Sequence, residues 1–279
     1  MKKALVIGSG SFRGAYSAGV ITFLGKELGS DYFDNVYACS VGVYMAAFFL
    51  AGQPEVIEDT WRHRVTGRQL VNYWNLFRGR NVLDLEYLED IFRQGESRLD
   101  LESLLRNRAR FEICLTNSES GSPTYVGIED GDILQIMSAS CAYPLLHPPI
   151  SLNGKDYLDG GISDSLPVRR ALDHGNEEVF AILTKPKSTA TSLDKGTRFF
   201  RRFIMPYIGF SPKIMKLIRD YENRRAAVER EIEDPRVRVI RPSQRLPLRN
   251  IIDTNHSRIN ESFNIGVRDA REFLKGYEL

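Results

Sequence analysis

Short apolar runs alternate with segments of helical periodicity along the first two thirds of the chain. Each run is nearly continuous, as expected for a strand that is buried on both faces. The predicted strands are Lys3–Ile7, Asn35–Cys39, Arg110–Thr116 and Glu178–Thr184. Segments 14–28 and 41–51 follow the first two strands and have helical character. Strands that alternate with helices predict an α/β fold, with a mostly parallel sheet covered on both faces.

The remaining segments predict additions to this core. Residues 55–108 are expected to form a helical insertion, because apolar residues recur there at helical spacing. Residues 186–279 are expected to form a C-terminal elaboration. It would contain a long charged helix over Lys213–Glu233, a late strand over Arg236–Ile240 and a closing helix over His256–Gly276. We therefore expect one domain over 1–279, with its core in about 1–185.

Composition excludes several classes of protein. The 279 residues are 42% hydrophobic and 27% charged, which is ordinary for a globular protein with one sizeable core. Lysine plus arginine exceeds aspartate plus glutamate by only 38 − 36 = 2, which argues against a dedicated nucleic-acid binder.

The sequence favours a cytoplasmic location. The apolar run Ala4–Ile7 is too short for the core of a signal peptide, and the longest apolar stretch, Val41–Ala51, is shorter than the roughly 20 residues of a membrane span. The three cysteines are far apart and form no CxxC pair. Such a set suits buried, reduced thiols better than disulfides or a zinc site, so we expect no metal.

A glycine-containing loop joins the first predicted strand to its helix, with the sequence Gly8-Ser9-Gly10-Ser11-Phe12-Arg13-Gly14. Such a loop presents unpaired backbone N–H groups at the positive end of a helix. It can hold a dinucleotide pyrophosphate, a phosphate or the oxyanion of an acyl-transfer intermediate. A tight turn without any ligand explains the same residues.

A serine lies in the turn between the second strand and its helix, in Ala38-Cys39-Ser40-Val41-Gly42. This is a variant of the G-x-S-x-G nucleophile elbow, in which small residues allow strand and helix backbones to approach closely. Ala38 replaces the first glycine and meets this requirement if its φ is negative. Serine is also a common N-cap, so the motif alone leaves both interpretations open.

The third motif is Asp159-Gly160-Gly161. An aspartate before two glycines is usually a turn. Together, however, the three motifs supply the oxyanion donors, the nucleophile and the base that acyl hydrolysis needs.

The ordered set of motifs resembles the patatin-like phospholipase family, and the resemblance covers most of the chain. The segment from Ala139 to Pro144, followed by Pro148-Pro149, is similar to the one that this family carries before its Asp-Gly-Gly motif. The end of the chain suggests the bacterial branch of small patatin-like proteins. The resemblance implies a three-layer α/β/α sandwich and a serine hydrolase of lipid acyl esters that needs no cofactor.

The resemblance also implies roles for individual residues. Ser40 would be the nucleophile and Asp159 its general base, in a dyad without histidine. The amides of Gly10 and Ser11 would bind the oxyanion, with those of Ser9 and Phe12 as further candidates. Arg13 would steady the loop or attract an anionic head group. The sequence departs from the family pattern at Ser9, Ser11 and Ala38, where glycine is usual.

Two other functions remain open from the sequence. A nucleotide-binding protein would use Gly8, Gly10 and Gly14, with Asp31 or Asp34 as the acid that contacts the ribose. This reading leaves the other two motifs unused. Alternatively, the departures at Ser9, Ser11 and Ala38 are those of a patatin-like lipid-binding module that has lost turnover. For the hydrolase, His147 is either an alternative base to Asp159 or, more simply, a residue that packs or lines the pocket.

A basic and aromatic stretch predicts contact with membranes. Residues 198–210 contain Arg198, Arg201 and Arg202 among large aromatic and aliphatic side chains. Such a stretch inserts at anionic lipid surfaces, or it packs on the core as a cap. We expect weak, peripheral binding to anionic membranes through these residues.

Overall fold

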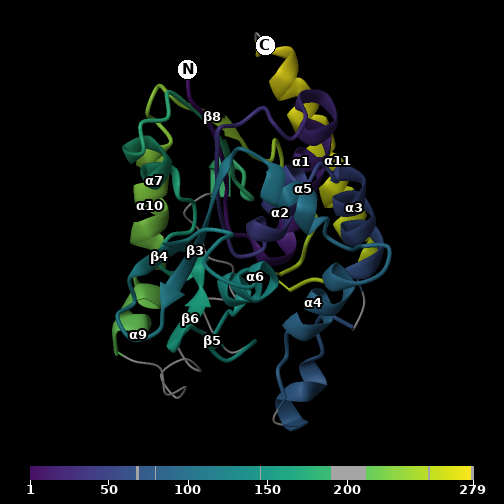
Figure 1. Ribbon diagram of the computed structural model, residues 1–279, viewed down its shortest axis with the longest axis vertical. Helices are drawn as coiled ribbons and strands as arrows, with labels where there is room; N and C mark the ends of the chain where they lie inside the picture. The colour runs from purple at the N-terminus through teal and green to yellow at the C-terminus, as the bar shows by residue number, and fades with distance from the viewer. Residues whose placement is uncertain (67–68, 79, 145, 190–211, 251, 278–279) are drawn as a thin grey trace.

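The computed structural model shows a mixed sheet between two layers of helices, and it describes residues 1–66, 69–78, 80–144, 146–189, 212–250 and 252–277 (Figure 1). Within these ranges eight strands join in one sheet, in the order β5-β6-β3-β2-β1-β7-β8, with β4 paired to β3 off this path. The strands are β1 (Lys3–Ile7), β2 (Asn35–Cys39), β3 (Arg110–Asn117), β4 (Pro123–Val126), β5 (Ile150–Leu152), β6 (Lys155–Asp159), β7 (Glu178–Ile182) and β8 (Val237–Ile240).

The centre of the sheet is parallel, from β3 through β2, β1 and β7 to β8. Ile7 at the end of β1 lies beside Ala38 of β2 and Ile182 of β7. The loops that follow these strands therefore meet at one edge of the sheet. At the other side β4 and β6 pair antiparallel with β3, and β5 pairs antiparallel with β6. This antiparallel addition brings Asp159 beside Leu115 of β3.

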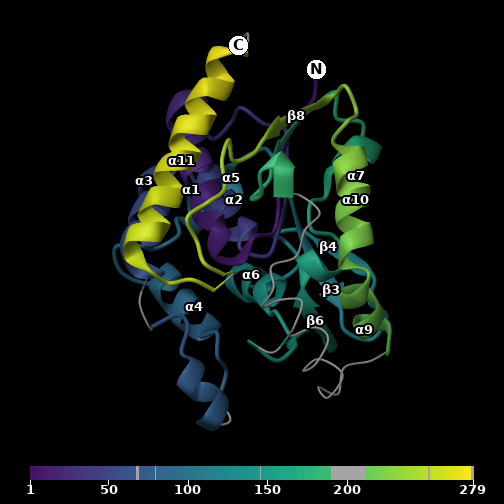
Figure 2. The same cartoon turned by 180° about the vertical axis from the view of Figure 1, so that it is seen from behind.

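Helices cover both faces of the sheet, and the two views from opposite sides agree on their placement (Figures 1 and 2). One layer holds α1 (Gly14–Leu28), α2 (Gly42–Leu50), α3 (Pro54–Asp59), α4 (Leu85–Arg93), α5 (Leu101–Arg106), α6 (Ile133–Cys141) and α11 (His256–Lys275). The other holds α7 (Val168–Asp173) and α10 (Tyr221–Glu231), and α9 (Pro212–Arg219) packs beyond the end of β6. The predicted three-layer α/β/α arrangement is confirmed.

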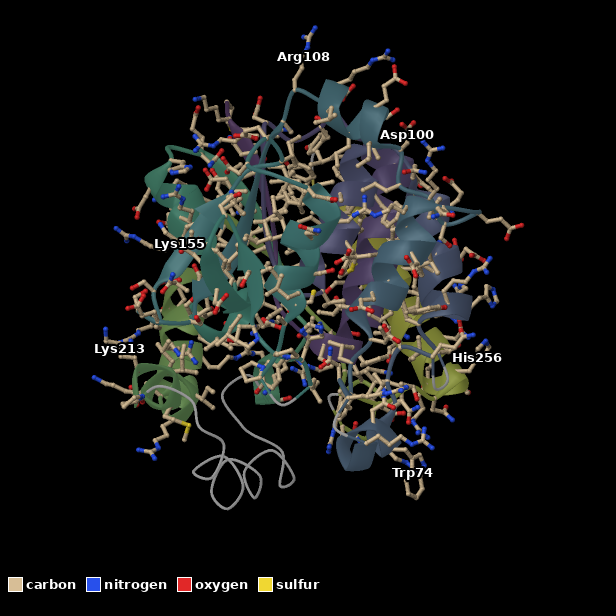
Figure 3. All side chains as sticks on the ribbon, turned by 60° about the horizontal axis from the view of Figure 1, so that its bottom comes forward. Trp74, Asp100, Arg108, Lys155, Lys213 and His256 are labelled. Atoms are coloured by element: carbon tan, nitrogen blue, oxygen red, sulfur yellow. The ribbon has the colours of Figure 1, made fainter. Side chains whose placement is uncertain are left out.

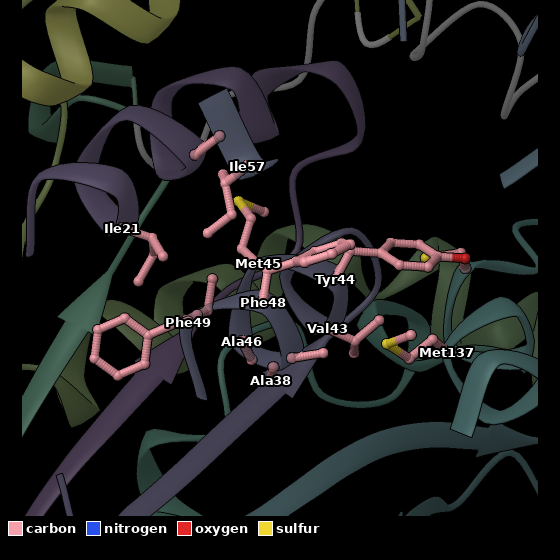
Figure 4. Close-up of a cluster of buried hydrophobic side chains, with 14 of the residues drawn as sticks. Ile21, Ala38, Val43, Tyr44, Met45, Ala46, Phe48, Phe49, Ile57 and Met137 are labelled. Atoms are coloured by element: carbon pink, nitrogen blue, oxygen red, sulfur yellow. The ribbon is translucent and has the colours of Figure 1, made fainter. Parts of the chain in front are cut away.

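Alternate residues of β1 point into the two layers. Leu5 and Ile7 are fully buried against the layer of α1 and α2, and Ala4 and Val6 against the layer of α7. The α2 helix is buried along its whole length, and its side chains, including Met45, form much of the core in Figure 4. A fully apolar helix must be enclosed on all sides, which fixes α2 at the centre of the molecule.

The α1 and α11 helices pack in direct backbone contact. A Cβ atom on Gly19 would overlap the carbonyl oxygen of Phe263, and one on Gly266 would overlap that of Tyr16. Only glycine permits so close an approach at both positions. The last helix is thereby fastened to the first, although they are more than 200 residues apart in sequence.

The predicted insertion at 55–108 contains, besides α3 to α5, a π-helical turn η2 (Thr60–Arg64) and a 3₁₀ segment η3 (Tyr73–Arg78). Further 3₁₀ turns are η1 (Ser11–Arg13), η4 (Gly160–Ile162) and η5 (Lys187–Thr189). Leu85, Leu88 and Phe92 of α4 are buried, as their helical spacing predicts.

The prediction of one helix over Lys213–Glu233 is wrong. The segment forms α9 and α10, which are separated at Asp220. The Leu217 carbonyl near the end of α9 accepts a hydrogen bond from Nη2 of Arg224 at 2.6 Å. A side chain that satisfies a helix-terminal carbonyl in this way stabilises the break. Strands β4 to β6 were not anticipated, and the basic stretch 198–210 lies outside the described residues.

No helix within the described ranges combines the length and the apolar character needed to cross a bilayer. The cytoplasmic location stays a prediction.

Candidate active site

Ser40 lies in a sharp turn between β2 and α2, in the left-handed region of backbone conformation. Its φ is +52°, whereas Ala38 has no positive φ, so the alanine is accommodated without backbone strain. A Cβ atom on Gly42 would come within 2.8 Å of the carbonyl oxygen of Ile7. The start of α2 therefore packs directly against the end of β1, which leaves no room for a side chain at position 42. A positive φ at a serine indicates stored strain, which is typical of functional sites.

Ser140 on α6 fixes this turn. Its Oγ accepts the backbone N–H of Ser40 at 2.8 Å and donates to the carbonyl oxygen of Cys114 at 2.8 Å. Ser140 is fully buried. Ser140 of α6 thus holds the strained Ser40 backbone against β3. The sequence alone did not indicate this role.

Asp159 is the hydrogen-bond partner of Ser40. The Ser40 hydroxyl donates to Oδ2 of Asp159 at 2.7 Å, and the Gly161 N–H donates to Oδ1 at 2.8 Å. Asp159 is the last residue of β6, and its backbone is held by Ala142 and Thr116. A Cβ atom on Gly160 would overlap the Cys114 carbonyl, so glycine is required where β6 turns away from β3. The structure brings together the two residues that the motifs singled out, 119 positions apart.

Asp159 is buried, with only 6% of its surface exposed. Burial raises the pKa of Asp159 to about 7, and the hydrogen bonds from Ser40 and Gly161 offset part of this increase. A carboxylate with a pKa near neutrality is a far better proton acceptor than one near 4. The environment of Asp159 therefore suits a general base.

The loop after β1 faces the same position. Among the described residues, the amides of Gly10, Ser11 and Phe12 have no hydrogen-bond acceptor. The amide of Ser9 is different, because it already donates to the carbonyl oxygen of Ser165 at 2.9 Å. The suggestion that Ser9 could join the oxyanion donors is therefore wrong.

The side chains around this loop hold its shape. Thr184 donates to the Ser9 carbonyl at 3.2 Å, and Nε of Arg13 reaches the Thr184 hydroxyl at 3.5 Å. A Cβ atom on Gly10 would come within 2.6 Å of Thr184. Gly14 begins α1, whose positive end adds to the field at the loop.

Ser11 has a φ of +49°, whereas Ser9 has no positive φ. We expect Ser11→Gly to stabilise the fold by up to about 1 kcal/mol, because relieved left-handed strain exceeds the entropy cost of glycine. Ser9→Gly should instead destabilise it by about 0.5–1 kcal/mol, since only the entropy cost applies. Urea denaturation of the two variants measures this difference, and shifts of the same sign and size would contradict it.

An apolar cavity of about 190 Å³ leads away from Ser40 and Asp159. Side chains of α2, the η2 turn and α4 line it, among them Tyr44, Phe48, Trp61, Leu88 and Phe92. Figure 4 shows Tyr44, Met45 and Phe48 on α2, with Ile57 nearby. At the polar end the cavity is lined by the loop from Ser9 to Arg13. Such a space accepts an aliphatic chain whose reactive end meets the serine.

The other candidate residues are His147 and the three cysteines, and of these four only Cys141 lines the cavity. His147 is not among the residues that line the cavity, and its Nδ1 lies 2.7 Å from the Pro148 carbonyl oxygen. Burial raises the pKa of the Cys39, Cys114 and Cys141 thiols, so they stay protonated and act as packing residues. Within the described ranges no group of three or more His, Cys, Asp or Glu side chains is arranged to hold a metal ion.

The acidic residues of the nucleotide-binding interpretation lie at the wrong edge of the sheet. Asp34 accepts the backbone N–H of Lys3 at the start of β1, at 2.7 Å, whereas the glycine loop follows the end of β1. Five residues of strand separate the two edges by about 15 Å. A ribose acid must stand at the same edge as the loop, so the fold removes this support for nucleotide binding.

Comparison with known proteins gives a consistent picture. The sequence profile of the patatin-like phospholipase family matches residues 5–172, which include all three motifs. An uncharacterized protein of Escherichia coli, YjjU, is 26% identical over 97% of this chain and 76% of its own length.

Relatives with a named activity are more distant. A probable lipid hydrolase, 463L, of Invertebrate iridescent virus 6 is 24% identical over 63% of this chain and 65% of its own length. The lysophospholipase NTE1 of Phaeosphaeria nodorum is 25% identical over 97% of this chain, which spans only 18% of that protein. The crystal structure of VipD from Legionella pneumophila has a similar fold, with a TM-score of 0.50 and 12% identity over 99% of this chain and 67% of VipD.

Proposed function

The chain belongs to the patatin-like phospholipase family, and we propose that it is a serine acyl hydrolase of lipid esters that uses Ser40 and Asp159 as a catalytic dyad. Family membership and the named relatives support lipid hydrolysis in general terms. The hydrogen bond of 2.7 Å from Ser40 to Asp159, at the polar end of an apolar cavity, carries the more specific proposal.

In the proposed reaction the Ser40 hydroxyl gives its proton to Oδ2 of Asp159 while Oγ attacks the ester carbonyl carbon. The carbonyl oxygen becomes an oxyanion and accepts hydrogen bonds from the amides of Gly10, Ser11 and Phe12. The intermediate collapses to an acyl-serine, and the leaving alcohol takes the proton from Asp159. Water then attacks the acyl-serine, Asp159 accepts the water proton, and release of the fatty acid returns that proton to Ser40.

The cavity suggests what kind of ester is bound. Its apolar walls suit the acyl chain, which gains favourable free energy for every methylene group removed from water. Arg13, Lys185 and Arg224 also line it, and Asp159 is the only acid among its described lining residues. Positive charge favours a substrate with an anionic head group, so we propose a phospholipid rather than a neutral glyceride.

A fluorophosphonate probe tests the nucleophile. We expect wild-type protein to be labelled covalently, with the adduct found on the peptide that contains Ser40. A Ser40→Ala variant should stay unlabelled, because it has no hydroxyl to attack phosphorus. Equal labelling of both proteins, or none of the wild type, would contradict the assignment.

A lipid-binding module without turnover is the second candidate, favoured by the strained Ser11 in the oxyanion loop. A variant with Ser9→Gly and Ser11→Gly discriminates the two. If neither this variant nor the wild type hydrolyses short-chain esters, while both bind lipid, the second candidate holds. The membrane contact expected through residues 198–210 stays a prediction.

A further inference from the structure

A turn between η2 and α4 projects from the body of the molecule and carries an exposed tryptophan. We call residues 72–78 and 80–82 the Trp74 turn. Trp74 is 64% exposed, and Figure 3 shows it at the tip of the projection, at the end of the molecule opposite Arg108. Its indole ring is amphipathic, with an apolar body and a single N–H donor.

The Trp74 turn is ordered by its own polar groups. The Asn72 side chain accepts the backbone N–H of Trp74 at 3.1 Å, and the Asn75 side chain donates to the Asn81 carbonyl at 2.8 Å. Asn72 also donates its N–H to the Val82 carbonyl at 2.9 Å, which closes the turn. Trp74 is therefore presented by a closed, hydrogen-bonded turn.

The charge of this region has one sign. From Thr60 to Leu83 the sequence contains five arginines and neither aspartate nor glutamate. Arg62 and Arg64 are paired with acids of neighbouring segments. Arg78 and Arg80 are exposed and have no ion-pair partner among the described residues. Two solvated cations thus accompany Trp74.

The base of the Trp74 turn is part of the catalytic cavity. Val71 and Leu83 form a bridge at its neck, and Leu83 donates its N–H to the Leu146 carbonyl at 2.9 Å. Leu70, Leu83, Leu85 and Leu146 all line the cavity that leads to Ser40. The neck of the Trp74 turn is therefore continuous with the wall of the cavity that leads to Ser40.

We infer that the Trp74 turn docks the protein on a bilayer surface that contains anionic phospholipid head groups. The amphipathic indole ring of Trp74 would enter the interface, where tryptophan is enriched in membrane proteins. Arg78 and Arg80 would contact the head groups, each adding electrostatic attraction that salt screens. This inference concerns where the protein meets lipid, and it extends the proposed function without depending on turnover.

Vesicle binding tests the inference, with Ser40→Ala in all proteins so that the lipid stays intact. We expect sedimentation with phosphatidylcholine vesicles that contain phosphatidylglycerol, and less with phosphatidylcholine alone. The double variant Arg78→Glu/Arg80→Glu should bind at least roughly 20-fold more weakly. Trp74→Ala should bind roughly tenfold more weakly.

Tryptophan emission gives a second readout, because the chain has two tryptophans and Trp61 is buried. Anionic vesicles should shift the emission to shorter wavelength, and Trp74→Phe should abolish the shift. The matched controls are Arg108→Glu, at the opposite end of the molecule, and Leu105→Ala, which removes from α5 a side chain that is 63% exposed. Both should bind like the parent protein.

The Trp74 and arginine variants, with Ser40 restored, should hydrolyse a soluble short-chain ester at the wild-type rate. Absence of vesicle binding, absence of the emission shift, or equal loss in the control variants would overturn the docking surface. If the wild-type protein does not hydrolyse the ester, that result counts against the proposed function and not against the docking surface. Vesicle binding is measured with Ser40→Ala and does not depend on hydrolysis.

Discussion

Replacing Asp159 with asparagine is expected to lower kcat/KM for ester hydrolysis by about 10³- to 10⁴-fold. The amide keeps the shape of the side chain but cannot accept the proton that Ser40 must lose. Asp159 is the only acid among the described residues that line the cavity, and His147 is not one of these residues. Steady-state hydrolysis of a soluble ester measures the change.

Wild-type activity should also depend on pH in a defined direction. The base must be deprotonated to act, and burial raises the pKa of Asp159 to about 7. We therefore expect kcat/KM to rise as pH increases through about 7 and then to level. The matched control is Asp156→Asn, which alters an exposed acid of the same strand and should change neither rate nor profile. An Asp159→Asn variant with more than a tenth of the parent rate would exclude Asp159 as the base.

The parts of the site that follow strand ends were predictable from the sequence. Strands β1 and β2 begin and end where their apolar runs predict, and each is followed by a turn of small residues and a helix. In a parallel sheet such turns gather at one edge, so the glycine loop and Ser40 had to be neighbours. The third motif was joined to them by its chemistry, since acyl hydrolysis needs a base, and not by its place in the sheet.

The remaining parts depend on contacts between distant segments, which periodicity does not encode. Asp159 reaches Ser40 through the antiparallel strand β6, which has only five residues, two of them exposed. In the sequence Ser140 is simply a serine within an apolar helical segment. A buried hydroxyl needs hydrogen-bond partners, but the sequence does not say that these are Ser40 and Cys114. The cavity lining comes from α2, η2 and α4, whose apolar residues read equally well as ordinary core.

Burial of Asp159 has opposite consequences for function and for stability. The desolvation that makes the carboxylate a good base also makes its ionisation unfavourable in the folded protein. An unfolded chain has no such penalty, so its Asp159 ionises near the ordinary aspartate pKa of 3.8. The folded state therefore binds a proton that the unfolded state has released, over the interval from about pH 4 to about pH 7.

Asp159→Asn is accordingly expected to stabilise the fold at alkaline pH, although it lowers activity. The pKa of Asp159 is higher in the folded than in the unfolded state. Its full contribution to the free energy of unfolding is therefore present below about pH 4 and is lost as pH rises to about 7. At about 1.4 kcal/mol per unit, the loss amounts to roughly 4 kcal/mol at most. Asparagine does not titrate, so the variant should gain stability over wild type by up to this amount at pH 8.

Urea denaturation of wild type, Asp159→Asn and Asp156→Asn at pH 5 and pH 8 gives the comparison, because all other titrating groups cancel between the proteins. A gain that is equal at the two pH values would show that Asp159 is not protonated in the folded protein near neutrality, and the proposed base would lose its physical support.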